Sequence, residues 1–347
     1  MMSGTSLDGL DIAAVDFTFQ RGRWSYVLRK AVTIRYDKKW KDQLATAHQL
    51  SGAAIIALHT AYGRFLGEQV RAFVKGNRLA APDFVASHGH TIFHQPDQRF
   101  TFQLGEINAL HAACGYPVVA DFRSLDVALG GEGAPLVPAG DEVLFSDYDI
   151  CLNLGGIANL SRRTGGKRVA FDVCFCNMAL NTLMAEVGKD YDAQGALAAT
   201  GEIHEGLLQA LTQQQMKWRK DRPSLGREMF ETSIQPLLEQ RAIPLADRLR
   251  TVCEMIALEI AQSVGRHTRP VRMLATGGGA LNTFLMSRIA AAGGPRLQVV
   301  IPERAVIEFK EALVFAFLGV LRMRGEANAL RSVTGASKDS SGGLLAG

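Results

Sequence analysis

The first stretch of the chain that could do chemistry is the turn SGTSLDG, residues 3–9, next to an apolar strand-like run. Glycines allow backbone N–H groups to converge, and the hydroxyls of Thr5 and Ser6 add donors, which suits a phosphate. The turn is not a P-loop, because the GxxxxGK[ST] pattern and a nearby lysine are both missing. Asp8 and Asp11 would repel a phosphate unless a cation such as Mg²⁺ lay between them. A tight hairpin without a ligand is the alternative.

A second glycine-rich turn lies in LATGGGALNTFL, residues 274–285. A strand-like run leads through Gly277, Gly278 and Gly279 into a helical pattern, so phosphates or a flat ligand could approach the backbone closely. The spacing is not GxGxxG, and a dinucleotide-binding fold is therefore not indicated. Close packing of the helix on the strand is the alternative.

A candidate general base is Asp172, which ends a strand-like run in AFDVCFCN and precedes a turn. A carboxylate at a strand end that faces a cleft can take a proton from a reacting group, but an ordinary surface aspartate fits the same pattern. Cys174 and Cys176 are expected to be packing residues, because one CxC lacks the second half of a zinc site.

Polar residues are frequent between Ser87 and Pro138. The segment SHGHTIFHQP contains three histidines: His88, His90 and His94. No neighbouring carboxylate or cysteine completes a metal site, so binding of a sugar or hydroxyl group, or simple turn chemistry, is favoured. Arg123, flanked by Asp121 and Asp126, could grip an anionic group of a substrate or form an internal ion pair.

Strands that alternate with helices must position these residues. Several apolar runs have strand length: Leu10–Phe17, Asp83–Ser87, Pro117–Ala120, Ile150–Leu154, Val169–Phe171, Val271–Ala275 and Leu297–Ile301. Helical spacing of apolar residues occurs over Ala53–Val74, Leu249–Val264 and Glu311–Arg322. The alternation predicts an α/β protein.

Length and composition limit the class of protein. A chain of 347 residues is expected to form two domains, and 47% apolar and 21% charged residues are typical of a globular protein. The net charge of +4 is weak and scattered, which argues against nucleic-acid binding. Five cysteines form no paired framework, and there is neither a signal peptide nor a stretch of 18 apolar residues. We therefore expect a cytoplasmic protein with no membrane partner.

A coarse internal repeat accompanies the two-domain length. The turn SGTSLDG beside the strand LDIAAVDF is echoed near the middle by the strand ICLNL, the turn GGIAN, a Gly-Gly turn and the strand RVAFD. Two hairpins with polar, glycine-rich tips suggest two related lobes, although any two hairpins resemble each other.

Ten motifs occur in order from about residue 2 to residue 343: SGTSLDGLD, HGHTIFHQP, ADFRSLDVALGGEGAPLVP, LNLGGIANLS, FDVCFCN, YDAQGALAATG, LGREMF, TGGGALN, KEALVFAFLG and SVTGAS. Together they closely resemble the anhydro-N-acetylmuramic acid kinases, which belong to the sugar kinase, heat-shock-protein-70 and actin superfamily. The resemblance implies a two-lobed actin-like ATPase fold, a duplicated ribonuclease H-like α/β fold with a central cleft. We place lobe I at residues 1–125, completed by the C-terminal segment 324–347, and lobe II at 126–323. The family resemblance also implies that the protein forms a homodimer.

The activity that the resemblance implies is ATP-dependent. The enzyme would open the 1,6-anhydro bond of 1,6-anhydro-N-acetylmuramic acid with water and phosphorylate O6, giving N-acetylmuramic acid 6-phosphate and ADP in peptidoglycan recycling. Asp172 would be the base that activates water, with Mg²⁺ at Asp8 and Asp11. ATP phosphates would lie on the first hairpin and along the second turn: Gly4, Thr5, Ser6, Leu7, Asp8, Gly9, Leu10, Asp11, Gly277, Gly278 and Gly279. The sugar would contact Arg123, which would face its lactyl carboxylate, and also Glu311, His90 and Asn177.

The chain departs from the family pattern in three places. The usual FDTGPGN reads FDVCFCN here, which keeps Asp172 and Asn177 but replaces both glycines and the proline with residues that stiffen the turn. His90 stands where glutamine is common. Only two methionines precede SGTS, so we expect most of the first strand to be missing and the chain to be less stable than its relatives. An amino-sugar kinase without ring opening, or a catalytically impaired ATP-binding homologue, stays an alternative.

Overall fold

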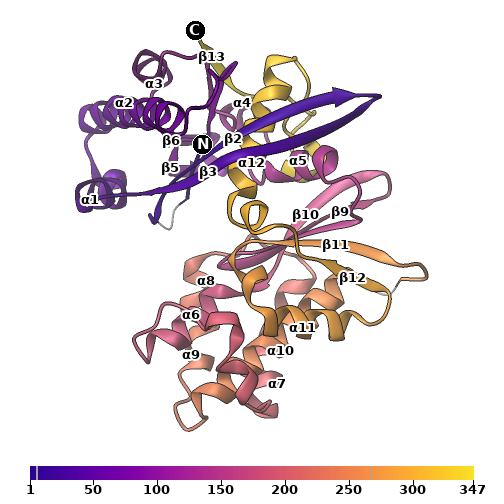
Figure 1. Cartoon of the computed structure of the whole chain (residues 1–347). Helices are drawn as coiled ribbons and strands as arrows, with labels where there is room; N and C mark the ends of the chain where they lie inside the picture. Colours follow the sequence, from indigo (N-terminus) through magenta and orange to yellow (C-terminus); the bar gives the residue numbers. More distant parts are fainter. Residues whose placement is uncertain (5–6, 266) are drawn as a thin grey trace. The chain divides into compact units, whose positions relative to one another are not determined.

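The structure is a computed structural model that describes residues 1–4, 7–265 and 267–347. It divides into two compact units (Figure 1): unit 1 contains Met1–Phe145 and Phe309–Gly347, and unit 2 contains Ser146–Glu308. The boundaries predicted for the two lobes lie at 125/126 and 323/324, whereas the two units meet at 145/146 and 308/309. The difference arises because α5 (Val137–Leu144) packs on the long hairpin of unit 1, and the C-terminal part of α12 (Arg304–Met323) contributes buried apolar residues there.

Unit 1 contains a five-stranded sheet in the order β3-β2-β1-β5-β6. Its strands are β1 (Met2–Ser3), β2 (Gly9–Gln20), β3 (Arg23–Arg35), β5 (His90–Gln95) and β6 (Phe100–Leu104). β1, β2 and β3 are antiparallel, and β1 is parallel to β5. A three-stranded sheet, β13-β7-β4, comprises β4 (Val85–Ser87), β7 (Val118–Ala120) and β13 (Leu344–Ala346). β1 also lies beside the end of β4, since the Met1 amino group donates to the Ala86 carbonyl at 2.7 Å.

Helices cover the sheets of unit 1. They are α1 (Lys38–Thr46), α2 (Gly52–Gly76), α3 (Ile107–Cys114), α4 (Ser124–Ala128), α5, most of α12 and α13 (Arg331–Thr334), with short 3₁₀ turns at Ala47–Gln49 and Pro96–Gln98. α2 and α3 pack closely because Gly63 faces the backbone of Glu106, where a Cβ would lie only 2.4 Å from the carbonyl oxygen. The core here includes Tyr62, Leu66 and Leu104.

Unit 2 contains a five-stranded sheet in the order β10-β9-β8-β11-β12. Its strands are β8 (Ile150–Leu154), β9 (Ile157–Thr164), β10 (Lys167–Phe175), β11 (Val271–Thr276) and β12 (Leu297–Val300). β8, β9 and β10 are antiparallel, whereas β8, β11 and β12 run parallel. The helices are α6 (Asn177–Ala185), α7 (Glu205–Arg219), α8 (Arg227–Ser233), α9 (Gln235–Leu238), α10 (Leu245–Val264) and α11 (Thr283–Gly293), with 3₁₀ turns at Ala193–Gly195, Ala198–Thr200 and Gly278–Leu281. α10 is largely buried against one face of the sheet, and α11 lies beside it (Figure 1).

The two units share one strand arrangement. Each has three consecutive antiparallel strands, and the first of the three also has a parallel neighbour, β5 in unit 1 and β11 in unit 2, as in ribonuclease H-like folds. In unit 1, β6 then pairs antiparallel with β5. The second and third strands meet in turns with two positive φ angles in succession, 51° and 77° at Arg21–Gly22 and 58° and 78° at Gly165–Gly166. The expected α/β fold, a duplicated ribonuclease H-like fold of the actin-like ATPase type, is confirmed. Among the described residues, none of the helices combines the length and apolarity that crossing a membrane requires.

Candidate functional site

Two glycine turns adjoin at one edge of the sheet of unit 2. β8 and β11 are parallel neighbours, with Thr276 opposite Asn153, so the turn after each strand lies at the same edge. Gly277 has φ = 80°, and a Cβ there would lie 2.6 Å from Asn153 Oδ1. A Cβ on Gly279 would lie 2.7 Å from Leu154 Cβ. The backbone of this turn therefore lies directly on the end of β8, an approach that only glycine permits.

Asn177, the first residue of α6, joins the two turns. Its Nδ2 donates to the Leu154 carbonyl at 3.0 Å, and its Oδ1 would lie 3.1 Å from a Cβ on Gly279. Its backbone N–H donates to the Gly155 carbonyl at 3.1 Å, while the N–H of Cys176 donates to Gly156 at 2.8 Å. Asn177 therefore fixes the turn geometry, and its contact with a sugar stays a prediction.

Asp172 belongs to a polar row that crosses this sheet. Asp172 on β10 is opposite Asn159 on β9, which is opposite Asn153 on β8, which is opposite Thr276 on β11. Residues in register share a face of the sheet, and Leu152 and Leu160 point to the other face, into the core. With strands about 4.8 Å apart, Asp172 lies two strands, or roughly 10 Å, from the strand that leads into the glycine turn Gly155–Gly156.

The Asp172 carboxylate is half-buried and anchored by one backbone donor. Its Oδ2 accepts a hydrogen bond from the Leu225 N–H at 2.9 Å. Burial raises the pKa of Asp172 above its ordinary value, and the Leu225 N–H partly opposes this. A bulge between Asp172 and Cys174 separates the carboxylate from the buried end of β10. A hollow of about 190 Å³ beside it is lined by residues that include Asp172, Trp218, Arg222 and Leu225.

The two cysteines after Asp172 are fully buried. Cys174 and Cys176 lie in the core of unit 2, as expected for packing residues. Burial raises the pKa of both thiols, that of Cys176 to about 12, so they stay protonated at neutral pH. They therefore neither act as nucleophiles nor bind metal in this state.

The N-terminal hairpin of unit 1 is described except at Thr5 and Ser6, which lie outside the described residues together with their predicted phosphate contacts. The Gly4 carbonyl accepts from the Leu7 N–H at 3.4 Å, and Leu7 has φ = 59°. Gly9 is the first residue of β2 and packs closely against β3, since a Cβ would be 2.5 Å from the Ile34 carbonyl oxygen. Leu10 is buried in the core, so its side chain is packing rather than facing a ligand.

Asp8 and Asp11 were the predicted Mg²⁺ ligands. Asp8 is exposed, and Asp11 Oδ1 accepts from Thr33 Oγ1 at 2.5 Å. Within the described ranges, no group of three or more His, Cys, Asp or Glu side chains could hold a metal ion. Mg²⁺ commonly uses one or two carboxylates and takes its other ligands from phosphates and water. The oxygen donors of Asp8 and Asp11 fit that limited role.

Arg123 is held by neutral acceptors rather than by the ion pairs that the sequence left open. Its Nε donates to His88 Nε2 at 2.9 Å, and its Nη1 donates to the Gly133 carbonyl at 2.6 Å. The Asp126 carboxylate instead accepts from the Gly133 N–H and from Thr334 Oγ1, both at 2.8 Å. Burial lowers the pKa of Arg123 to about 10, a value at which the guanidinium stays charged at neutral pH.

Glu311 lies on α12 and keeps contact with solvent. The protein atoms crowded around it nevertheless raise the pKa of its carboxyl, and the charge of Asp11 raises it further. Arg123 and Lys310 oppose this shift. Glu311 thus lies within electrostatic range of both Arg123 and Asp11 in unit 1, and the predicted contacts of Glu311 and Arg123 with a sugar stay predictions.

His90 is an internal residue of unit 1. Its Nδ1 is hydrogen-bonded to Ser3 Oγ at 2.9 Å, and Ser3 Oγ is 2.7 Å from the hydroxyl of Tyr36. The Tyr36 hydroxyl in turn lies 2.6 Å from that of Tyr62. Only 3% of the His90 surface is exposed, and burial lowers its pKa to about 4. His90 therefore ties β1 to β5, and its contact with a sugar hydroxyl stays a prediction.

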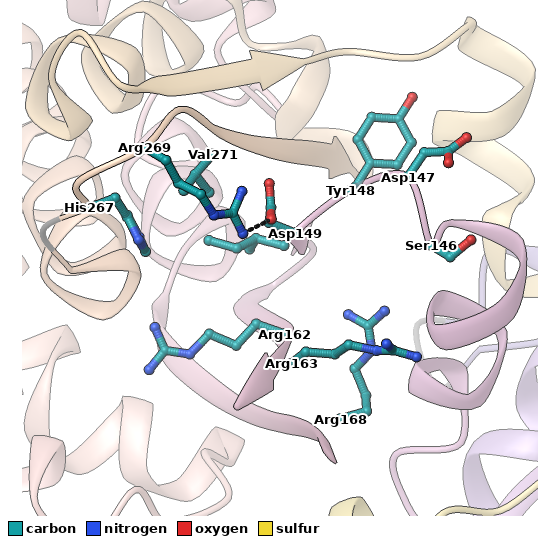
Figure 2. A pocket seen from close by; sticks show the side chains of 11 residues that line it. Ser146, Asp147, Tyr148, Asp149, Arg162, Arg163, Arg168, His267, Arg269 and Val271 are labelled. Carbon is teal, nitrogen blue, oxygen red and sulfur yellow. Dashed lines mark hydrogen bonds and ion pairs between the residues drawn. The ribbon is translucent and has the colours of Figure 1, made fainter. Parts of the chain in front are cut away.

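A second hollow on unit 2 lies at the opposite strand ends from the glycine turns (Figure 2). It has a volume of about 420 Å³ and is lined by the starts of β8 and β11 and by several arginines. Arg269 Nη2 donates to Asp149 Oδ1 at 2.6 Å, and Arg162 Nη1 donates to the Ser263 carbonyl at 2.8 Å, at the end of α10. Arg269 holds the segment before β8, and Arg162 holds the end of α10. Because these two arginines are bound to the protein itself, the hollow is a poor candidate for the catalytic site.

Sequence reasoning missed several residues of these groups. Asn153 and Asn159 in the polar row were not assigned to a site, and the contact of His88 with Arg123 was not foreseen. The signal was present in LNLGGIANLS, where asparagines at alternating strand positions flank two glycines.

Comparison with known proteins gives consistent matches. The family model for anhydro-N-acetylmuramic acid kinase matches residues 1–346. The anhydro-N-acetylmuramic acid kinase of Vibrio parahaemolyticus serotype O3:K6 is 33% identical over 362 residues, which cover 99% of this chain and 96% of that protein.

Two solved structures give weaker matches. The ethanolamine utilization protein EutJ from Carboxydothermus hydrogenoformans has a TM-score of 0.37 and 16% identity, covering 84% of this chain and 80% of its own. A ROK family glucokinase from Streptomyces griseus in complex with glucose and AMPPNP has a TM-score of 0.34 and 13% identity, covering 83% and 94%. At these scores neither structure bears on the function of this chain.

Proposed function

Since the chain belongs to the anhydro-N-acetylmuramic acid kinase family, we propose that it hydrolyses the 1,6-anhydro bond of 1,6-anhydro-N-acetylmuramic acid and phosphorylates O6 with ATP. The products are N-acetylmuramic acid 6-phosphate and ADP, which serves peptidoglycan recycling and amino-sugar catabolism. The observation that carries the proposal is the polar row, which runs from Asp172 on β10 to Thr276 on β11, the strand that leads into the turn Gly277–Gly279. Three strand spacings of about 4.8 Å separate the two ends of the row by roughly 14 Å, which leaves room for a sugar between the base and a phosphate on that turn.

Asp172 acts as the general base in this proposal. Its raised pKa makes it a better proton acceptor than an ordinary aspartate. The Leu225 N–H holds Oδ2, which leaves Oδ1 to take the proton of the attacking water. Water attacks the anomeric carbon, the C1–O6 bond breaks, and the freed O6 is the nucleophile for the terminal phosphoryl group of ATP.

Backbone groups would bind the nucleotide phosphates. The turn Gly277–Gly279 supports this role in unit 2, and residues Gly4–Asp11 would do so in unit 1. Asp8 and Asp11 would hold Mg²⁺, which neutralises charge on the phosphates when it is bound. Asp11 is also oriented by Thr33, which donates to its Oδ1.

Arg123 and Glu311 would bind the sugar. Arg123 remains charged, and among the described residues no protein partner is recorded for its Nη2. A guanidinium with a free N–H group suits the lactyl carboxylate of the substrate. Glu311, with its raised pKa, would accept or share a hydrogen bond with a sugar hydroxyl. Asn177 and His90 would support the sugar site through the turn and strand that they fix.

ADP release with three additions tests the proposal. With MgATP and 1,6-anhydro-N-acetylmuramic acid we expect ADP together with N-acetylmuramic acid 6-phosphate, detected by mass spectrometry. ADP formed only with a reducing amino sugar would instead support an amino-sugar kinase without ring opening. Nucleotide binding without any sugar-dependent ADP would support a catalytically impaired homologue.

We also propose that the protein works as a homodimer, as its family resemblance implies, and that it is cytoplasmic, as its cysteines suggest, because none of them forms a disulfide in the described residues. Size-exclusion chromatography with light scattering tests the first point. A mass near twice the 37.6 kDa of one chain is expected, and a monomer at the concentrations of the activity assay would contradict it.

A further inference from the structure

Arg123 owes its orientation to a small group of buried contacts in unit 1. Nε donates to His88 Nε2 at 2.9 Å, and Nη1 donates to the Gly133 carbonyl at 2.6 Å. The guanidinium carbon lies 5.8 Å from the ring centre of Phe315, and the His88 ring lies 4.7 Å from the same centre. Two of the three guanidinium nitrogens are therefore engaged by the protein, and Nη2 is the one left for a ligand among the described contacts.

His88 is built to accept a hydrogen bond at Nε2. Its side chain is 4% exposed, and its Nδ1 lies 3.0 Å from the Gly89 carbonyl oxygen. A carbonyl only accepts, so Nδ1 carries the proton and Nε2 carries the lone pair that faces Arg123. Burial lowers the pKa of His88 well below its ordinary value, and the charge of Arg123 lowers it further. The imidazole of His88 is thus neutral at neutral pH.

The other support of Arg123 is fixed as well. Gly133, which has φ = 66°, offers its carbonyl to Nη1 and its N–H to Asp126 Oδ2. Asp126 is fully buried and also accepts from Thr334 Oγ1 at 2.8 Å. Asp126 thereby holds the loop that carries Gly133 and does not compete for the guanidinium.

We propose that His88 is a positioning residue that selects substrates with a carboxylate, because it fixes the Arg123 guanidinium with Nη2 directed at that group. The inference rests on the proposed role of Arg123 toward the lactyl carboxylate. A lysine-like point charge would attract any anion, whereas a guanidinium held at two nitrogens recognises a planar carboxylate at a defined place. His88 itself touches neither the sugar nor the nucleotide.

The test compares two substrates that differ in the carboxylate. 1,6-Anhydro-N-acetylmuramic acid carries the lactyl group, and 1,6-anhydro-N-acetylglucosamine lacks it. For His88→Leu we expect KM for the first to rise about tenfold or more, since an oriented charged hydrogen bond is lost. We expect kcat to change less than about threefold. The KM of the second, or its Ki as a competitive inhibitor, should stay unchanged.

Conservative variants separate positioning from folding. Gln places its amide oxygen near the position of Nε2, so His88→Gln should restore most of the affinity for the lactyl substrate, whereas the shorter His88→Asn should not. If His88→Leu does not fold, the Gln and Asn pair gives the same comparison. His48→Leu, at an exposed histidine whose Nε2 is hydrogen-bonded to the side chain of Gln49, is the matched control and should leave both substrates unaffected.

A double-mutant cycle with Arg123→Lys distinguishes the two ways in which the inference can fail. If Arg123→Lys raises KM for the lactyl substrate and His88→Leu adds nothing to it, the two residues act as one unit, as proposed. If Arg123→Lys raises KM but His88→Leu does not, or if His88→Leu weakens both substrates equally, the role of His88 is refuted. If Arg123→Lys leaves the lactyl substrate unaffected, the proposed role of Arg123 fails first, and the inference fails with it.

Discussion

Acid sensitivity of unit 1 follows from the burial of His90. The ring is 3% exposed and bonded to Ser3, and its pKa is lowered to about 4. In the unfolded chain the same ring has a pKa of about 6.5. Below pH 6.5 the unfolded state therefore binds a proton that the folded state does not bind, and stability is lost as the pH falls toward 4. His90→Gln removes this titration and keeps a hydrogen-bonding side chain next to Ser3.

The size of the effect follows from the two pKa values. Between pH 7 and pH 5, a group with a folded pKa of about 4 and an unfolded pKa of about 6.5 costs roughly 2 kcal/mol of stability. The other buried histidines titrate equally in both proteins, so they cancel in the comparison. The loss of stability between pH 7 and pH 5 should therefore be smaller by about 2 kcal/mol in His90→Gln than in the parent.

Urea denaturation at both pH values measures this difference. Trp24 and Trp40 belong to unit 1 and Trp218 to unit 2, so in a Trp218→Phe background the tryptophan fluorescence reports on unit 1 alone. The parent for this comparison is the Trp218→Phe protein. An equal loss of stability in the two proteins would refute the reasoning, because it would mean that His90 titrates in the folded state as it does in water.

Three further predictions follow from single contacts. Asp172→Asn should keep MgATP affinity by calorimetry but lose about 10²–10⁴-fold in kcat, and near-normal turnover would remove Asp172 from the mechanism. Gly277→Ala should weaken MgATP binding at least about tenfold, because the added Cβ would lie 2.6 Å from Asn153 Oδ1. Gly294→Ala is the control with similar backbone strain, since Gly294 has φ = 74° and its Cβ would meet nothing within 4 Å. Equal effects of the two substitutions on MgATP binding would contradict the proposed role of the turn. Thr334→Val should lower the free energy of unfolding by about 1–3 kcal/mol, because Asp126 loses a buried donor, whereas the exposed Thr232→Val should have little effect.

The strand pattern was predicted better for unit 2 than for unit 1. The predicted runs correspond to β2, β4, β7, β8, β10, β11 and β12, whereas β1, β3, β5, β6, β9 and β13 had no predicted counterpart. Runs such as Ile150–Leu154 and Val271–Ala275 match β8 and β11 because parallel central strands are apolar on both faces. β3 and β9 were not predicted, since they carry exposed charged residues on one face and pair with neighbours through register rather than apolar content. Helices α2 and α10 were recognised from their regular apolar spacing, with boundaries that extend beyond the predicted ones.

Residues of the candidate site could be predicted only where the residue type itself, in its local sequence, indicates a function. Asp172 and the triple glycine stood out by type, but the polar row depends on cross-strand register, which a sequence does not display. His88 and His90 are two residues apart and similar in sequence, yet one contacts Arg123 and the other lies in a hydroxyl chain with Ser3. Only the packing around β4 and β5 separates these roles.

Transfer of isotope from water tests the central claim most directly. In a single turnover with MgATP and 1,6-anhydro-N-acetylmuramic acid in ¹⁸O-water, the account predicts one ¹⁸O at the anomeric oxygen of the sugar phosphate and one ADP per sugar. Label in inorganic phosphate, or a phosphorylated sugar that still contains the anhydro bond, would contradict it.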